Sequence, residues 1–310
     1  SLHDALPISD KQCYAHAFVI IASSSAYLAG TLGAKELLDE ALETYDKYFW
    51  DEEEGLSKDT WNTEFTELSP YRGLNSNMHT VEAFLAASDA LSDEKYRVRA
   101  GRIIDRVVRL AEENSYRLPE HYKENWEPEP DKFMEKSDDP FKPFGATPGH
   151  GIEWARLITQ WAMSTKSLTD EERSKYIETA EKLYKRAYDD AWNKNNVPGF
   201  SYTTDWEGNT VVSDRMHWTL AEAINTSAVL YRVKGSERYT EDYAMFMKYL
   251  DEVVADHKNG SWFHQLDRHN HVIGTVWPGK SDLYHAVQAT LIPYNERIGI
   301  SIAASLYETA

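Results

Sequence analysis

The sequence predicts an all-α fold, a ring of helical hairpins. Three observations lead to this prediction. Helical periodicity dominates the chain, apolar segments alternate with amphipathic ones, and a histidine stands at or near the start of each apolar segment. Successive histidines are separated by 63, 71, 67 and 68 residues, and they are His16, His79, His150, His217 and His285.

This period is too long for the common solenoid repeats. It indicates hairpins placed around a ring, with the apolar helices inside and the amphipathic helices outside. Each inner helix is then buried on nearly all sides. Because the inner helices would start at one mouth of the ring, the histidines would gather there around a central pocket.

The expected hairpins follow in chain order. They pair apolar 12–29 with amphipathic 35–49, 76–91 with 94–113, 150–165 with 170–192, 217–233 with 236–257, and 284–292 with a last segment at 299–308. Two of the connecting loops, 199–214 and 261–276, alternate polar and apolar residues around a turn sequence. Each loop therefore predicts a short β-hairpin.

Composition limits the partners and the location. The formal net charge is −18, spread along the 310 residues, and such a field repels nucleic acid and anionic membranes. No apolar run approaches the length of a membrane span. Cys13 is the single cysteine, which fits a reducing cytoplasm. We therefore expect a cytoplasmic protein that binds neither nucleic acid nor membranes.

The first nine residues, "SLHDALPIS", match neither a signal peptide nor the helical pattern. We interpret residues 1–9 as a non-native scar and expect residues 10–310 to form a single domain.

The stretch "TPGHGIEWARL", residues 147–157, opens one of the apolar helices with titratable groups. His150 would lie in the first turn, where unpaired backbone N–H groups and the helix dipole disfavour a cationic imidazolium. The ring would then be able to accept a proton. Glu153 shares its helical face and could orient the ring. For a single such pair, a capped helix start is the better explanation.

Three further helix starts repeat this arrangement, which is hard to explain by packing alone. Their polar and aromatic residues are spaced by three or four: Asn75, His79 and Glu82; Trp218 and Glu222; Asp282, His285 and Gln288. Histidines with carboxylates and aromatic side chains suggest proton transfer on a polyhydroxylated substrate. The sequence contains no nucleophile elbow, glycine-rich phosphate loop or nucleotide fingerprint.

The remaining histidines are given structural or surface roles. We expect His16 and His217 to be structural, with Tyr14 the better candidate for a pocket wall. The loop histidines are expected to be solvated: His264, His269 and His271.

Four ordered motifs resemble the N-acylglucosamine 2-epimerase superfamily, and within it the aldose–ketose isomerase branch that includes mannose and sulfoquinovose isomerases. They are "YRGLNSNMHTVEAFLAASDAL", "FGATPGHGIEWARLI", "MHWTLAEAI" and "PGKSDLYHAVQATLIP". The likeness runs from about Tyr14 to Pro293. It implies an (α/α)6 barrel, which agrees with the ring expected from the histidine spacing.

The resemblance also implies a mechanism and a set of site residues. A histidine would remove the proton next to the open-chain carbonyl of a sugar and return it to the neighbouring carbon, through a cis-enediol. By motif position His150 and His285 would be the catalytic pair, and Glu153 would orient His150. The substrate-binding residues would be Tyr14, Asn75, His79, Glu153, Trp218, Glu222 and Gln265. We expect no metal and no cofactor.

The expected substrate is an unphosphorylated hexose, with D-mannose and D-fructose as the default pair. Sulfoquinovose isomerisation and sugar 2-epimerisation stay open. A sulfonate would call for a cation near the sugar's C6 end, and only Arg72 and Lys280 lie close to the motifs.

The chain is shorter than six hairpins at this spacing would require. We therefore expect an N-terminally truncated barrel that lacks its first hairpin, which could self-associate as a homo-oligomer.

Three rival functions stay open. A metal enzyme could use the two His-x-x-Glu pairs, although di-iron bundles use the reverse order and zinc sites use tighter clusters. A glycoside hydrolase could use Glu153 and Glu222 as paired acids, but this leaves His150 and His285 without a role. A sugar-binding fragment without catalysis is the third rival.

Overall fold

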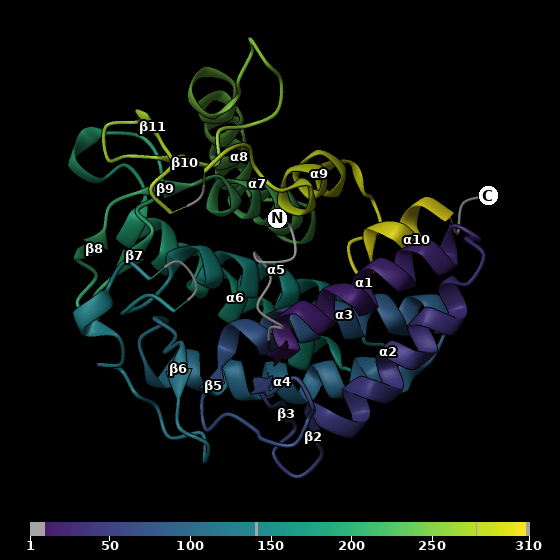
Figure 1. The fold of residues 1–310 in the computed structure, drawn as a ribbon. Helices are drawn as coiled ribbons and strands as arrows, with labels where there is room; N and C mark the ends of the chain where they lie inside the picture. Colours follow the sequence, from purple (N-terminus) through teal and green to yellow (C-terminus); the bar gives the residue numbers. More distant parts are fainter. Residues whose placement is uncertain (1–9, 140–141, 277, 308–310) are drawn as a thin grey trace. The chain divides into compact units, whose positions relative to one another are not determined.

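The structure is a computed structural model that describes residues 10–139, 142–276 and 278–307, and most of them are helical (Figure 1). The interpretation of residues 1–9 as a scar therefore lies outside the described residues. The chain forms two compact units. The first comprises the described residues of Ser1–Arg106, His121–Glu129 and Ala303–Ala310, and the second comprises those of Val107–Glu120 and Pro130–Ile302.

The first unit contains α1 (Cys13–Leu28), α2 (Ala34–Tyr48), α3 (Leu74–Leu91) and most of α4 (Glu94–Glu113). Helix α1 packs against both α2 and α3. Helix α3 is buried on nearly all sides, as expected for an inner helix, whereas α2 buries a stripe at a spacing of three and four: Leu38, Ala41, Leu42 and Tyr45. Helix α1 buries less than expected, since Val19 on it is 38% exposed.

The second unit repeats this pattern with α5 (Pro148–Ser164), α6 (Asp170–Ala191), α7 (His217–Lys234), α8 (Glu237–Tyr249) and α9 (Leu283–Leu291). Helices α5 and α7 are buried on nearly all sides and pack against each other. Helix α5 also packs on α6, and α7 also packs on α8 and α9. The helical segments match the predicted ones to within a few residues, except that α8 ends earlier and continues as a π-helical turn at Leu250–Val254.

Short helices complete the chain: η2 (Met134–Lys136), η3 (Lys194–Asn196), η5 (Ile292–Tyr294) and α10 (Ile302–Tyr307). None of the helices in the described part of the chain has the length and hydrophobicity that a membrane span requires.

The strands are two or three residues long and lie in the connections between helices. In the first unit β1 (Lys11–Gln12) pairs with β4 (Thr60–Trp61), β2 (Trp50–Asp51) with β3 (Leu56–Ser57), and β5 (Arg72–Gly73) with β6 (His121–Tyr122). In the second unit β7 (Thr203–Thr204) pairs with β8 (Thr210–Val212), and β10 (Gln265–Leu266) lies between β9 (Arg215–Met216) and β11 (Val272–Ile273). Both predicted hairpins are confirmed.

Strand β9 fixes the point at which α7 begins. It ends at Met216, and His217 is the first residue of the helix. The register pairs Met216 with Gln265 and Arg215 with Leu266. Because the strand is held by β10, the first turn of α7 has a defined position in the second unit.

Candidate active site

The first turn of α5 holds His150 against an aromatic ring. Pro148 occupies the start of the helix, where its missing N–H costs nothing. Gly149 lets Trp218 approach closely, because a Cβ at this position would lie 2.5 Å from the indole ring. The ring of His150 then lies 5.2 Å from that of Trp218, centroid to centroid.

The carboxylate that orients His150 is Glu120. The Nδ1 atom of His150 lies 2.9 Å from Oε1 of Glu120, which is 5% exposed. This corrects the expectation that Glu153 orients the ring. Glu120 follows α4 in an irregular loop thirty residues earlier, so helical spacing gave no signal for it.

His285 is held by its own helix start. Asp282 is the N-cap of α9 and accepts a hydrogen bond from the backbone N–H of His285 at 2.8 Å. Both Asp282 oxygens also lie 3.2 Å from the His285 Nδ1. The His285 ring stands 5.9 Å from the ring of Trp218. His150 and His285 thus each face Trp218, and each has a carboxylate at Nδ1.

Asp282 also contacts a second imidazole. The Nε2 atom of His217 lies 2.8 Å from Oδ2 of Asp282. Burial lowers the pKa of His217, so its ring is neutral at pH 7. Burial raises the pKa of Asp282, but hydrogen bonds from His217 and His285 outweigh it and hold that pKa far below its usual range. The structural role expected for His217 is therefore support of Asp282.

His264 extends this cluster, contrary to expectation. Its ring lies 4.7 Å from that of His217. Burial, followed by the charge of His217, lowers the pKa of His264 to about 4. The prediction of a solvated His264 is wrong, because β10 draws the preceding loop towards α7. His269 and His271 are exposed, as predicted.

A fully buried charge network lies on α5 and α7. Arg156 donates to both oxygens of Glu222, from Nε at 2.7 Å and from Nη2 at 3.1 Å. The same Nη2 lies 3.4 Å from Oε1 of Glu153. Glu153, Glu222 and His285 each bring one polar atom within 4.8 Å of the others. One guanidinium with two carboxylates leaves a net negative charge beside His285.

Gln265, an expected pocket residue, makes side-chain hydrogen bonds within the second unit. Its side chain is fully buried, and its amide NH2 donates to Asp214 Oδ2 at 2.7 Å and to Thr275 Oγ1 at 3.1 Å. Its amide oxygen accepts from the backbone N–H of Val276 at 3.0 Å. Gln265 therefore holds the loop after β11, and both of its amide hydrogens are committed to that task.

The first unit contains the other three expected residues. The rings of Tyr14 and His79 meet edge to face at 5.0 Å, and His79 Nδ1 lies 4.0 Å from Glu82. The side-chain oxygen of Asn75 is buried and has no hydrogen-bond partner among the described residues. The Nε2 atom of His16 lies 2.8 Å from the backbone carbonyl oxygen of Ala41. This contact fits the structural role expected for His16.

Two donor sets in the second unit could hold a metal ion. One consists of His217, Asp282 and His285, and the other of Glu153, Glu222 and His285. Both include His285, so a metal bound there would occupy the proposed base.

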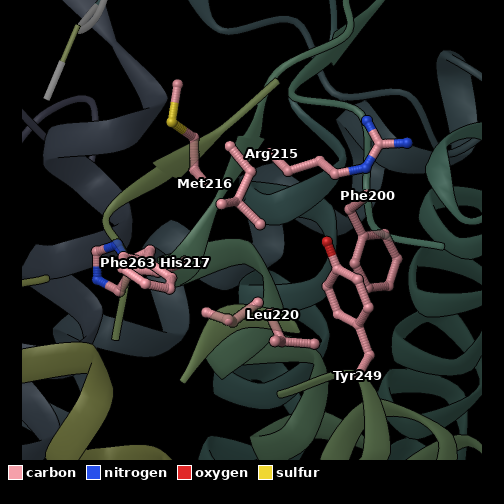
Figure 2. Close-up of a pocket in the computed structure, with 9 residues that line it drawn as sticks. Phe200, Arg215, Met216, His217, Leu220, Tyr249 and Phe263 are labelled. Carbon is pink, nitrogen blue, oxygen red and sulfur yellow. The ribbon is translucent and has the colours of Figure 1, made fainter. Parts of the chain in front are cut away.

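A small cavity lies behind His217 and is not a sugar site. Figure 2 shows His217 and Phe263 on one side of it, with Arg215, Phe200 and Tyr249 on the other. Its volume of about 10 Å³ holds a single water at most.

Comparisons with known proteins identify the family of this chain. The family model described as N-acylglucosamine 2-epimerase (GlcNAc 2-epimerase) matches residues 3–289. A D-mannose isomerase from Thermobifida fusca is 40% identical, over 92% of this chain and 70% of its own length. Another from Pseudomonas cannabina pv. alisalensis is 39% identical, over 92% and 69%. A crystal structure of a D-mannose isomerase matches 97% of this chain and 73% of its own chain, with a TM-score of 0.81 and 26% identity.

The chain belongs to the N-acylglucosamine 2-epimerase family. This confirms the resemblance drawn from the four motifs and the (α/α)6 class of fold. It also confirms that the chain is an enzyme of the sugar isomerase type.

Proposed function

We propose that the chain interconverts D-mannose and D-fructose by histidine-mediated proton transfer through a cis-enediol, without a metal. One observation supports this most: His150 and His285 each have a carboxylate at Nδ1, and both rings face Trp218. A carboxylate accepts a hydrogen bond, so it favours the tautomer with the proton on Nδ1. The Nε2 lone pair of a neutral ring is then the base.

The reaction takes two steps, and each step includes two proton transfers. One imidazole removes the C2 proton of open-chain mannose while the other, in its protonated form, gives a proton to O1. The enediol then takes the first proton back at C1 and loses the O2 proton to the second imidazole. The product is fructose, and both rings return to their starting states.

The remaining residues would bind the sugar. Trp218 offers an apolar face on which a sugar ring can stack, and the buried negative charge of Glu153 and Glu222 would stabilise a cationic imidazole at His285. In the first unit the Asn75 oxygen is an acceptor that a sugar hydroxyl can satisfy. We retain Tyr14 and His79 as further binding residues.

An uncharged hexose fits the available cations better than a sulfonated one. Arg72 donates to the carbonyls of Ser69 and Tyr71 at 2.7 and 2.8 Å, and Lys280 pairs with Asp256. The charge of Lys280 is thus neutralised by an aspartate, and Arg72 is held by the carbonyls of its own segment. With a single buried Cys13 and a strongly acidic chain, we propose a cytoplasmic enzyme whose partner is a monosaccharide.

The substrate is tested by proton NMR of D-mannose, D-glucose and sulfoquinovose, each incubated with the protein. Fructose formed from mannose, and no sulfonated ketose, is the expected result. Mannose formed from glucose without fructose would instead make the enzyme a 2-epimerase. Turnover of sulfoquinovose alone would reject the mannose assignment.

A further inference from the structure

A second cavity in the second unit is lined by cations. It has a volume of about 350 Å³, and Lys194, Arg215, Arg268 and His269 line it together with hydroxyl, amide and aliphatic side chains. None of its nine lining residues is acidic. This contrasts with the chain as a whole, whose net charge is −18.

The three cations of the cavity differ from Arg97 and Arg117, which form ion pairs with aspartates. Arg97 pairs with Asp89 at 2.7 Å, and Arg117 pairs with Asp190 at 2.7 Å. Arg215, which is 5% exposed, donates instead to neutral backbone carbonyls at 2.7 to 3.1 Å. Burial lowers the pKa of Arg215, and the charges of Asp267 and Asp214 offset this only in part.

The other two cations, Lys194 and Arg268, also have no acidic partner among the described residues. Lys194 donates to the Asp189 carbonyl at 2.8 Å, and the Arg268 Nε lies 3.0 Å from His269 Nε2. Neither forms an ion pair with any residue in the described part of the chain. Three cations therefore share one concave space without a bound negative charge.

Two acidic residues near Arg215, Asp214 and Asp267, accept hydrogen bonds from neutral groups. Asp214 accepts from the Gln265 amide at 2.7 Å. Asp267 accepts from the backbone N–H groups of His269 and His271 at 2.7 and 2.9 Å. These carboxylates keep their charge, but neither lines the cavity, whose lining residues include three cations and no acidic group.

We propose that this cavity binds a phosphate group, either as inorganic phosphate or as part of a small phosphorylated sugar. Arginine matches the geometry of phosphate oxygens, and lysine adds a point charge. Ser213 and Thr210 add neutral hydroxyl donors. The volume exceeds that of phosphate alone and lies at the lower end for small-molecule sites, which suits a phosphorylated monosaccharide.

The position of the site suggests control of turnover. Arg215 opens β9, and His217 and Trp218 follow it directly. Figure 2 shows the Arg215 side chain extending towards Phe200, away from His217. A ligand that pulls on this guanidinium would shift the strand that sets the first turn of α7. The control of turnover rests on the proposed function, whereas the binding of phosphate to the cavity does not.

The test is isothermal titration calorimetry with inorganic phosphate, mannose 6-phosphate and unphosphorylated mannose. The key variant is the double substitution Lys194→Ala/Arg268→Ala, which leaves the buried Arg215 in place. The control is Lys175→Ala/Lys248→Ala, two exposed lysines outside the cavity. Circular dichroism melts establish that each variant folds.

We expect both phosphate compounds to bind, and the key variant to bind them about tenfold more weakly or worse while the control is unchanged. Tighter binding of mannose 6-phosphate than of phosphate identifies a sugar phosphate as the ligand, and equal binding identifies free phosphate. No heat at 10 mM of either compound, or equal affinity in the key variant, would overturn the proposal. An unchanged isomerisation rate with phosphate bound would overturn only the control of turnover.

Discussion

The two proposed catalytic histidines are held in different ways. His285 depends on Asp282, which lies three residues earlier, caps the same helix and also contacts His217. His150 depends on Glu120, which lies on a loop thirty residues away. The side chain of Asp282 is 41% exposed, whereas that of Glu120 is 5% exposed.

Similar imidazole–carboxylate pairs can therefore form between residues close in sequence, as for His285, or between residues joined only by folding, as for His150. Asp282 does three tasks at once, so its loss affects α9 and two rings. Glu120 contacts His150 and caps no helix in the described part of the chain. The predictions that follow test whether this asymmetry is real, starting with the largest effect.

Replacing either histidine should abolish most of the activity. His150→Asn and His285→Asn are each expected to lower kcat by about 10³-fold, because general acid–base catalysis contributes on that scale. Fructose formation from mannose is the measurement. His269→Asn, an exposed ring in the same unit, is the control and should keep full activity. Full activity of either catalytic variant would remove that ring from the mechanism.

Removing the carboxylate charge should affect activity differently in the two imidazole–carboxylate pairs. Glu120→Gln is expected to lower kcat on the order of 10²-fold with little change in KM or melting temperature. Asp282→Asn keeps a good N-cap residue, so the helix start survives while the charge is lost. We expect it to lower kcat further and to shift the kcat–pH profile, since two rings lose their acceptor.

Glu124→Gln, an exposed change on the same loop as Glu120, is the matched control. Equal losses in all three variants would show that the effect comes from the loops and not from the histidines.

The first turn of α5 should tolerate a methyl group at one glycine and not at another. Gly149→Ala places a Cβ 2.5 Å from Trp218 and should lower the free energy of unfolding by about 1–3 kcal/mol. Gly151→Ala places one 3.5 Å from Ala187, an ordinary contact, and should raise it by up to about 1 kcal/mol through helix propensity. Chemical denaturation of both variants measures this contrast. Equal stability would mean that Trp218 does not pack on Gly149.

The histidine cluster should make the fold sensitive to mild acid. The pKa of His264 is lowered from 6.5 to about 4, so the unfolded chain binds more protons between these values. Stability should therefore be fully present above pH 6.5 and fall as the pH drops towards 4. His264→Gln should flatten this loss, measured by urea denaturation at pH 7, 5.5 and 4.5, whereas His269→Gln should leave it unchanged.

The sequence predicted what depends on local spacing. Helix positions, the buried character of α3, α5 and α7, and the contact between Asp282 and His285 all follow from periodicities of three and four residues. Glu120 and the pairing of Arg156 with Glu222 do not, because their partners lie 30 and 66 residues away and are joined only by folding. His264 was misplaced because a two-residue strand decides which loop side chains turn inward.

The most direct test of the proposed mechanism is deuterium exchange at C2 of D-mannose in D2O, followed by proton NMR with EDTA present. The wild-type protein is predicted to form fructose and to place deuterium at C2 of the recovered mannose. His150→Asn and His285→Asn are predicted to do neither at a comparable rate. Exchange that stops with EDTA and returns with added metal, or exchange that persists in both variants, would contradict proton transfer by these two histidines.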